Sequence, residues 1–181
     1  MTSRRGRKFL DTDALEVTKL KVAYMEQCTD LSLQFEACDA TSVLQMRRLI
    51  NCVGEPLGGC FLMTLVLSDG LFSSQTEDSV RRVVNAKWNA LKTLEKIAPI
   101  QTLDFCVSFS SVSALVGNLG QSNYGIANTV VDGYLARHKN AFSVSVPPIS
   151  HLGYFSRYEW ARESNIKPTI LGPDGKLFAA V

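Results

Sequence analysis

This 181-residue sequence has little of what marks several specialised protein classes. Its five cysteines and two histidines form no CxxC pair and no ligand-like cluster, so we expect no metal site. With 19 Lys and Arg against 17 Asp and Glu, the net charge of +2 argues against a dedicated nucleic-acid binder and against a disordered acidic tail. The most apolar run, residues 60–67, is too short to cross a bilayer. No signal-peptide pattern follows the basic first eight residues, and free cysteines fit a reducing, cytoplasmic setting.

What the sequence does contain is a regular alternation of amphipathic stretches with short apolar runs. Periodicity predicts helices near 12–29, 41–52, 76–97 and 122–138, and strands near 31–38, 59–67, 103–110 and 142–149. Ser74 and Glu77 suggest a capping box before the third helix. This alternation predicts an α/β fold with a Rossmann-like, doubly wound parallel sheet, whose chemistry lies at the carboxyl ends of the strands.

The most informative stretch runs from Phe109 to Asn128, FSSVSALVGNLGQSNYGIAN. Ser111 lies at a predicted strand end, and Tyr124 follows in the first turn of a helix, with Asn128 one turn further on the same face. A serine and a tyrosine brought together can hold a carbonyl oxygen, and the tyrosine can give it a proton, best with a cation nearby. The alternative is a Ser/Gly-rich loop that leads into an ordinary helix, with Tyr124 as a half-buried packing residue.

This stretch resembles the active site of ketoreductase domains of type I polyketide synthases, fungal ones in particular, within the short-chain dehydrogenase/reductase superfamily. The resemblance implies that Tyr124 is the proton donor, that Ser111 binds the substrate carbonyl, and that Lys87 and Asn128 complete the catalytic set. Most short-chain reductases place the lysine four residues after the tyrosine, and this family resembles a version in which lysine and asparagine are exchanged. Taken alone, Lys87 would be interpreted as a solvated helix lysine.

The resemblance also implies an NADPH site. Ser3 and Arg4 resemble the positions that accept the 2′-phosphate of NADPH, for which a guanidinium is well suited. Asp39 resembles an aspartate placed for the adenine. The alternatives are a disordered basic N-terminus and, for Asp39, a role as N-cap of the following helix.

The implied reaction is NADPH-dependent reduction of a β-ketoacyl thioester to a β-hydroxyacyl thioester. Its substrate would be tethered to the phosphopantetheine arm of an acyl carrier protein domain, with other synthase domains as further partners. Leu67-Ser68-Asp69 partly matches a pattern that the family uses to infer product stereochemistry. No GxSxG elbow surrounds Ser111, which argues against a serine hydrolase.

The sequence departs from the family in lacking a GxGxxG turn for the pyrophosphate. We therefore expect residues 1–181 to form a single, partial ketoreductase domain, with an incomplete sheet whose first strands and last strand are missing. The strand near 31–38 would then lack a neighbour, and the strand near 59–67 would have an open edge. Two hypotheses follow: the catalytic half of an NADPH-dependent ketoreductase, or a catalytically inactive ketoreductase fragment with a structural or partner-binding role.

Overall fold

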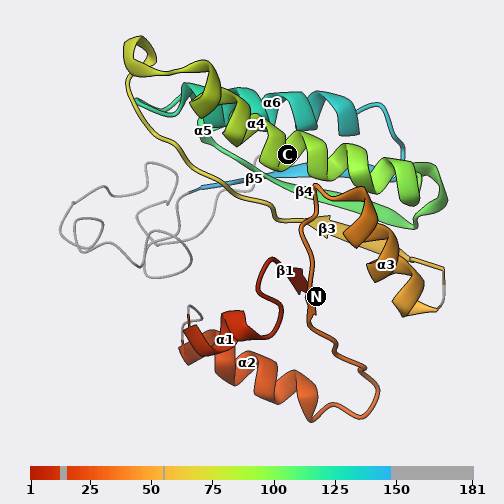
Figure 1. The fold of residues 1–181 in the computed structure, drawn as a ribbon. Coiled ribbons are helices and arrows are strands. Elements are labelled where there is room, and N and C mark those ends of the chain that lie inside the picture. Colours follow the sequence, from red (N-terminus) through yellow and green to blue (C-terminus); the bar gives the residue numbers. More distant parts are fainter. Residues whose placement is uncertain (13–15, 55, 148–181) are drawn as a thin grey trace, which may run out of the picture.

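The structure, a computed structural model, describes residues 1–12, 16–54 and 56–147 (Figure 1). Its strands form two parallel sheets. The small sheet pairs β1 (Thr2–Ser3) with β2 (Glu36–Ala37), and the larger has the order β3-β4-β5, from β3 (Gly59–Leu62), β4 (Phe105–Ser111) and β5 (Ala141–Val146). All pairs being parallel, the described strands have the arrangement of a Rossmann-like sheet.

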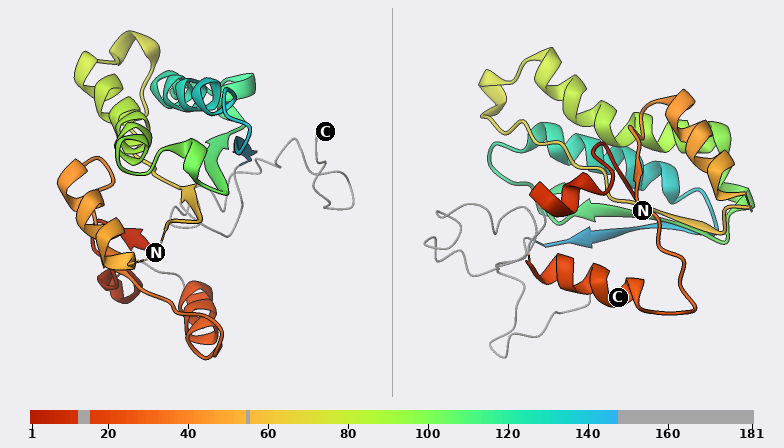
Figure 2. Two further views of the ribbon diagram at one scale, coloured as in Figure 1. Left: turned by 90° about the vertical axis from the view of Figure 1, so that its right-hand side faces the viewer. Right: turned by 60° about the horizontal axis from the view of Figure 1, so that its bottom comes forward.

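Helices connect these strands as crossovers. They are α1 (Lys8–Thr12), α2 (Glu16–Glu26), α3 (Val43–Val53), α4 (Glu77–Ile97), α5 (Ser113–Val116) and α6 (Ser122–Leu135), with 3₁₀ turns at Phe72–Ser74 and Ile100–Thr102. Both views in Figure 2 place α4 and α6 side by side on one face of the larger sheet. Within the described part of the chain, none of these helices has the length and apolarity that a bilayer span requires.

The hydrophobic core lies between this helix pair and the sheet. Its fully buried side chains include Leu91 and Leu94 of α4, Leu135 of α6 and Cys106 of β4. Cys60 of β3 stands opposite Cys106 in the ladder. Because alternate strand residues point to opposite faces, the remaining positions of β3, β4 and β5 form a second face. This apolar sheet face comprises Phe61, Phe105, Phe109, Phe142 and Val144, and the ring centroids of Phe61 and Phe105 lie 5.1 Å apart.

Most predicted elements are present, but several boundaries were wrong. The strand expected near 31–38 is only Glu36–Ala37, and the one near 59–67 ends at Leu62. The expectation that the first of these would have no neighbour was wrong, because the Cys38 amide donates to the Ser3 carbonyl at 2.9 Å as β1 pairs with β2. The open edge of β3 was predicted correctly, since β4 is its ladder partner within the described residues. The helix expected near 12–29 corresponds to α2 at Glu16–Glu26, whereas α1 lies almost entirely before the expected start, and residues 148–149 of the final strand lie outside the described residues.

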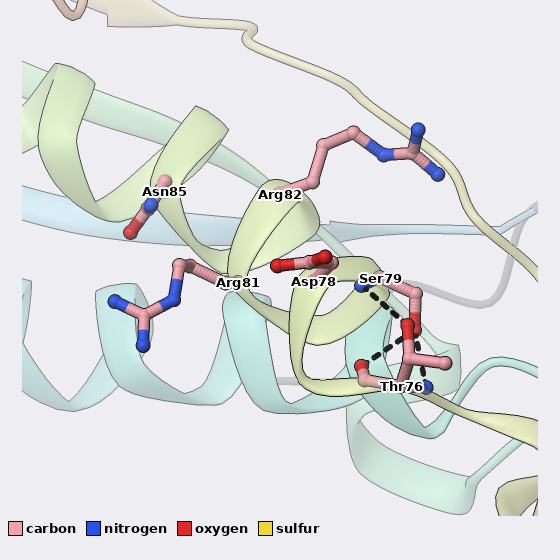
Figure 3. Close-up of a pocket in the computed structure, with 6 residues that line it drawn as sticks. All are labelled: Thr76, Asp78, Ser79, Arg81, Arg82 and Asn85. Atoms are coloured by element: carbon pink, nitrogen blue, oxygen red, sulfur yellow. Dashed lines mark hydrogen bonds between the residues drawn. The ribbon is translucent and has the colours of Figure 1, made fainter.

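The capping box of α4 was also predicted at the wrong residues. Thr76 is the N-cap: its hydroxyl accepts a hydrogen bond from the Ser79 amide at 3.1 Å, and the Ser79 hydroxyl accepts one from the Thr76 amide at 3.0 Å (Figure 3). Ser74 instead lies in the preceding 3₁₀ turn, where its hydroxyl donates to the Leu71 carbonyl. Glu77 forms an ion pair with Arg81 one turn further along the helix.

Candidate active site

The end of β4 and the beginning of α6 bring three of the predicted catalytic residues together. Ser111 is the last residue of β4, Tyr124 lies in the first turn of α6, and Asn128 follows one turn later. The side-chain nitrogen of Asn128 donates to the backbone carbonyl of Tyr124 at 2.9 Å. The Ser111 hydroxyl lies 2.6 Å from that of Ser113 and accepts a hydrogen bond from the Ser113 amide at 3.2 Å, so the local turn fixes its position.

The Tyr124 phenol is held in a partly buried environment. Burial raises the pKa of Tyr124, while the polar side chains of Asn128 and Ser111 lower it by less. The phenol is therefore protonated at neutral pH and can donate a proton. Because both side chains favour the ionised form, they also stabilise the phenolate that remains after the proton has left.

Lys87 of α4 joins these residues. Its side chain is only 5% exposed, and its ammonium donates to the Phe109 carbonyl of β4 at 2.8 Å and lies 6.0 Å from the centre of the Tyr124 ring. Burial lowers the pKa of Lys87 to about 8, and the charge of Asp132 opposes that fall. The interpretation of Lys87 as a solvated helix lysine is wrong, whereas Lys96 on the same helix is exposed.

Asn123 is a further residue of this region that sequence reasoning missed. It is fully buried: its amide nitrogen donates to the Ser68 carbonyl at 2.7 Å and to Gln75 at 3.1 Å, and its side-chain oxygen accepts from the Tyr124 amide at 2.7 Å. Asn123 therefore ties the loop after β3 to the first turn of α6. Its position directly before the tyrosine was the available signal, but its partners are distant in sequence.

Two more bonds fix that loop against α6. The side-chain amide of Gln121 donates to the Asp69 carboxylate at 2.9 Å, and the backbone amide of Gly70 donates to the Gly120 carbonyl at 2.9 Å. The Leu67-Ser68-Asp69 segment singled out in the sequence thus borders the start of the helix that carries Tyr124. Any substrate that reaches Tyr124 from this side would meet a loop whose backbone is already anchored.

The three residues predicted to bind cofactor gather at the carboxyl ends of β1 and β2. Two hydrogen bonds from Thr41, from its amide at 2.9 Å and its hydroxyl at 2.8 Å, lower the pKa of Asp39, and the charge of Arg4 lowers it as well. Ser3 lies in β1, whose pairing with β2 contradicts the alternative of a disordered basic N-terminus. The N-cap role considered for Asp39 was wrong, because the Ser42 hydroxyl caps α3 by accepting from the Gln45 amide.

Comparison with known proteins decides the family. The model of the KR domain family matches residues 1–150. The chain belongs to the KR domain family. The highly reducing polyketide synthase of Strobilurus tenacellus is 36% identical to this KR domain over 156 residues, which cover 85% of the chain and 6% of the synthase. A highly reducing polyketide synthase of Aspergillus terreus is 31% identical over 153 residues, 81% of the chain and 6% of the synthase.

Solved structures agree with this family. An A-type ketoreductase from a modular polyketide synthase superimposes on the KR domain with a TM-score of 0.67 and 28% identity, covering 80% of this chain and 31% of that one. The first ketoreductase of the tylosin synthase gives 0.64 and 28%, with the same coverage. The fold is therefore the Rossmann-like fold of the short-chain dehydrogenase/reductase superfamily. The chain spans about 6% of these curated relatives and 31% of these solved ketoreductases.

An open pocket of about 540 Å³ lies on the N-terminal half of α4 in the KR domain. Figure 3 shows its lining, which consists of Thr76, Asp78, Ser79, Arg81, Arg82 and Asn85. Both arginines are already engaged, because Arg81 forms an ion pair with Glu77 and Arg82 donates to the Ser68 hydroxyl at 2.7 Å. None of the predicted catalytic residues lines this pocket, so it does not define the active site.

Proposed function

We propose that residues 1–181 form a single, partial ketoreductase domain that carries the catalytic residues for reducing a β-ketoacyl thioester to a β-hydroxyacyl thioester with NADPH. The observation that carries this proposal is the position of one phenol. The polar side chains of Ser111 and Asn128 act on the Tyr124 phenol by lowering its pKa, and the buried ammonium of Lys87 lies 6.0 Å from the centre of its ring. A proton donor, a carbonyl-binding hydroxyl and a cation are thereby gathered at the carboxyl end of β4.

The chain's own residues would act on the carbonyl oxygen. The nicotinamide of bound NADPH supplies the hydride that reaches the carbonyl carbon. Ser111 would donate a hydrogen bond to the carbonyl oxygen and hold it beside Tyr124. As that oxygen gains negative charge, Tyr124 would transfer its phenolic proton to it, and the Lys87 charge would stabilise the phenolate.

The residues of this chain fit the two ends of an NADPH molecule. At the adenosine end, Arg4 and Ser3 would hold the 2′-phosphate, and Asp39 would hold the adenine. At the nicotinamide end, the side-chain oxygen of Asn128 is buried and accepts no hydrogen bond from the described residues, so it is available to a donor. The glycine-rich turn that would bind the pyrophosphate has no counterpart in these 181 residues.

The partners follow from the relatives, which are large synthases that this chain matches over a small part of their length. We infer that the substrate is presented on the phosphopantetheine arm of an acyl carrier protein domain and that other synthase domains act with this one. The cytoplasm, where free thiols such as those of this chain persist, is the proposed compartment.

The experiment measures NADPH binding by fluorescence titration of the full chain, and then reduction of a short β-ketoacyl thioester. We expect Tyr124→Phe to lower the rate by about 10²-fold or more, because the proton donor is removed, and to leave NADPH affinity within a factor of about two. Tyr134→Phe is the matched control, because Tyr134 lies on the same helix and packs edge-on against Trp88.

Two outcomes would contradict the proposal. Retained reduction by Tyr124→Phe would assign the proton to another group. No NADPH binding by the folded chain would favour the second hypothesis, a catalytically inactive ketoreductase fragment with a structural or partner-binding role.

A further inference from the structure

One face of α6 carries a third polar residue beyond the predicted pair. Tyr124, Asn128 and Asp132 follow one another at intervals of four residues, so their side chains leave the helix on the same side. The Ser110 hydroxyl of β4 donates to one carboxylate oxygen of Asp132 at 2.6 Å. The other carboxylate oxygen is buried and accepts no hydrogen bond from the described residues. A buried carboxylate oxygen without a donor is costly unless a positive charge lies nearby.

Lys87, in turn, has fewer hydrogen-bond acceptors than its ammonium group can use. Its ammonium carries three N–H donors, and the acceptor found for it among the described residues is the Phe109 carbonyl. The elements packed against it present few charges: α6 contributes Tyr124 and Asp132, and β4 contributes a carbonyl and the Ser110 hydroxyl that binds Asp132. Asp132 is thus the charged group whose field acts on Lys87.

We propose that Asp132, anchored by Ser110, is a positioning residue that keeps Lys87 in its charged form beside Tyr124. A neutral lysine could not stabilise the Tyr124 phenolate, so loss of the Asp132 charge would weaken the proton donor without removing it. The pairing of charges is argued from neighbouring contacts: Lys87 and Asp132 bind adjacent residues of β4, and the second Asp132 oxygen is buried without a donor among the described residues. Its effect on turnover rests on the proposed function. The burial that lowers the pKa of Lys87 to about 8 explains why a counter-charge is needed at neutral pH.

The test is a pH titration of Lys87 in the full chain, monitored by NMR of ε-¹³C-labelled lysine. We expect Asp132→Asn to lower the pKa of Lys87 by about one unit or more, since an opposite charge has been removed. Asp132→Glu, which keeps the charge, should restore much of the wild-type value. Asp78→Asn is the matched control, because it removes an exposed carboxylate from the first turn of α4 and should leave Lys87 unchanged. A Lys87 titration unaffected by Asp132→Asn would overturn the proposal.

Asp132→Asn could also fail to fold, and a double variant then decides. If misfolding comes from a buried ammonium without a counter-charge, adding Lys87→Met must restore the cooperative unfolding transition. A double variant that still fails to fold would assign Asp132 a purely structural role and refute the proposal.

If the chain reduces a thioester, its steady-state kinetics give a second measurement. Asp132→Asn should lower kcat by about tenfold near pH 7 with KM nearly unchanged, and should move the alkaline fall in activity to lower pH. A kcat of Asp132→Asn equal to wild type across this range would contradict the catalytic part of the proposal. The Lys87 titration needs no cofactor, so a chain that proved inactive would refute the proposed function while leaving the charge pairing to be judged by NMR.

Discussion

Lys87 shows how one buried side chain connects stability with chemistry. The side chain is almost fully enclosed between α4, α6 and β4, and the enclosure that lowers its pKa also places its charge near the Tyr124 ring. An exposed lysine would be hydrated and screened, and would interact more weakly with a phenolate. The folded protein therefore gives up some free energy of unfolding to hold a cation at this position.

This loss predicts a specific pH dependence. The pKa of Lys87 is about 8 in the folded protein against an ordinary value of 10.5, so the unfolded chain binds more protons between these values. The free energy of unfolding of wild type, relative to Lys87→Met, should therefore rise from about pH 8 to about pH 10.5, by about 3 kcal/mol in total, and stay flat below pH 8.

Urea denaturation of both proteins at a series of pH values measures this difference. Using the difference cancels the contributions of groups common to both, including the buried thiols of Cys60 and Cys106, whose pKa values burial raises to about 11 and 12. Lys92→Met, which removes a lysine that packs over Trp88, tests for effects of the substitution itself. A difference between wild type and Lys87→Met that does not change with pH would show that Lys87 is not enclosed as described.

The sequence predicted the site residues that share a local pattern, and the family resemblance added Lys87 from a separate helix. The spacing of Ser111, Tyr124 and Asn128 and their resemblance to a known family were enough to bring them together. Asn123 and Asp132 could not be found this way, because their roles depend on Ser68 and Lys87, which lie on other elements. Partners of this kind become visible only when the packing of the elements is known.

Among the elements, helices were predicted better than strands. The three- and four-residue spacing of apolar side chains located α4 within one residue of Glu77–Ile97. Strand lengths depend on neighbours that the pattern does not contain: β2 is short because β1 offers only Thr2 and Ser3 for pairing. The turn that follows β1 also depends on a contact between segments, because Gly6 packs closely against β2.

A substitution at Gly6 tests how the small sheet packs. Its φ is +55°, and a Cβ at this position would lie 2.9 Å from the Ala37 backbone nitrogen. Gly6→Ala should therefore lower the free energy of unfolding by more than the ~1–2 kcal/mol that a left-handed conformation alone costs an L-residue. Gly54→Ala is the control, because Gly54 has a φ of +74° but nothing within 4 Å of the added carbon. Equal losses in urea denaturation would mean that β1 does not pack on β2 as described.

At the scale of the molecule, the described residues cover the larger sheet unevenly. Helices α4 and α6 cover one face, whereas the apolar sheet face beside the open edge of β3 leaves Phe61 60% exposed and Phe142 55% exposed. Exposed apolar surface next to an unpaired strand edge promotes association between copies.

We therefore predict that Phe61→Lys lowers self-association of the chain. Light scattering after size-exclusion chromatography, over rising protein concentration, should show a smaller mean mass than for wild type. Phe72→Lys is the matched control, because Phe72 is 81% exposed in the 3₁₀ turn before α4 and not on the apolar sheet face. If the two variants reduced the mean mass equally, the apolar sheet face would not be the surface responsible.

The parallel pairing of every described strand also has a consequence for how the chain folds. No ladder here is closed by a tight hairpin: Gly59 pairs with Phe105, and Cys106 with Ala141, each across a long crossover that contains a helix. Contacts between residues so distant in sequence make folding slow, because much chain entropy is lost before the hydrogen bonds of the ladder form. During synthesis, β4 cannot gain its second neighbour until Ala141 has left the ribosome. Until then one edge of β4 is unpaired, and the helices that pack against β4 are held there mainly by side-chain packing.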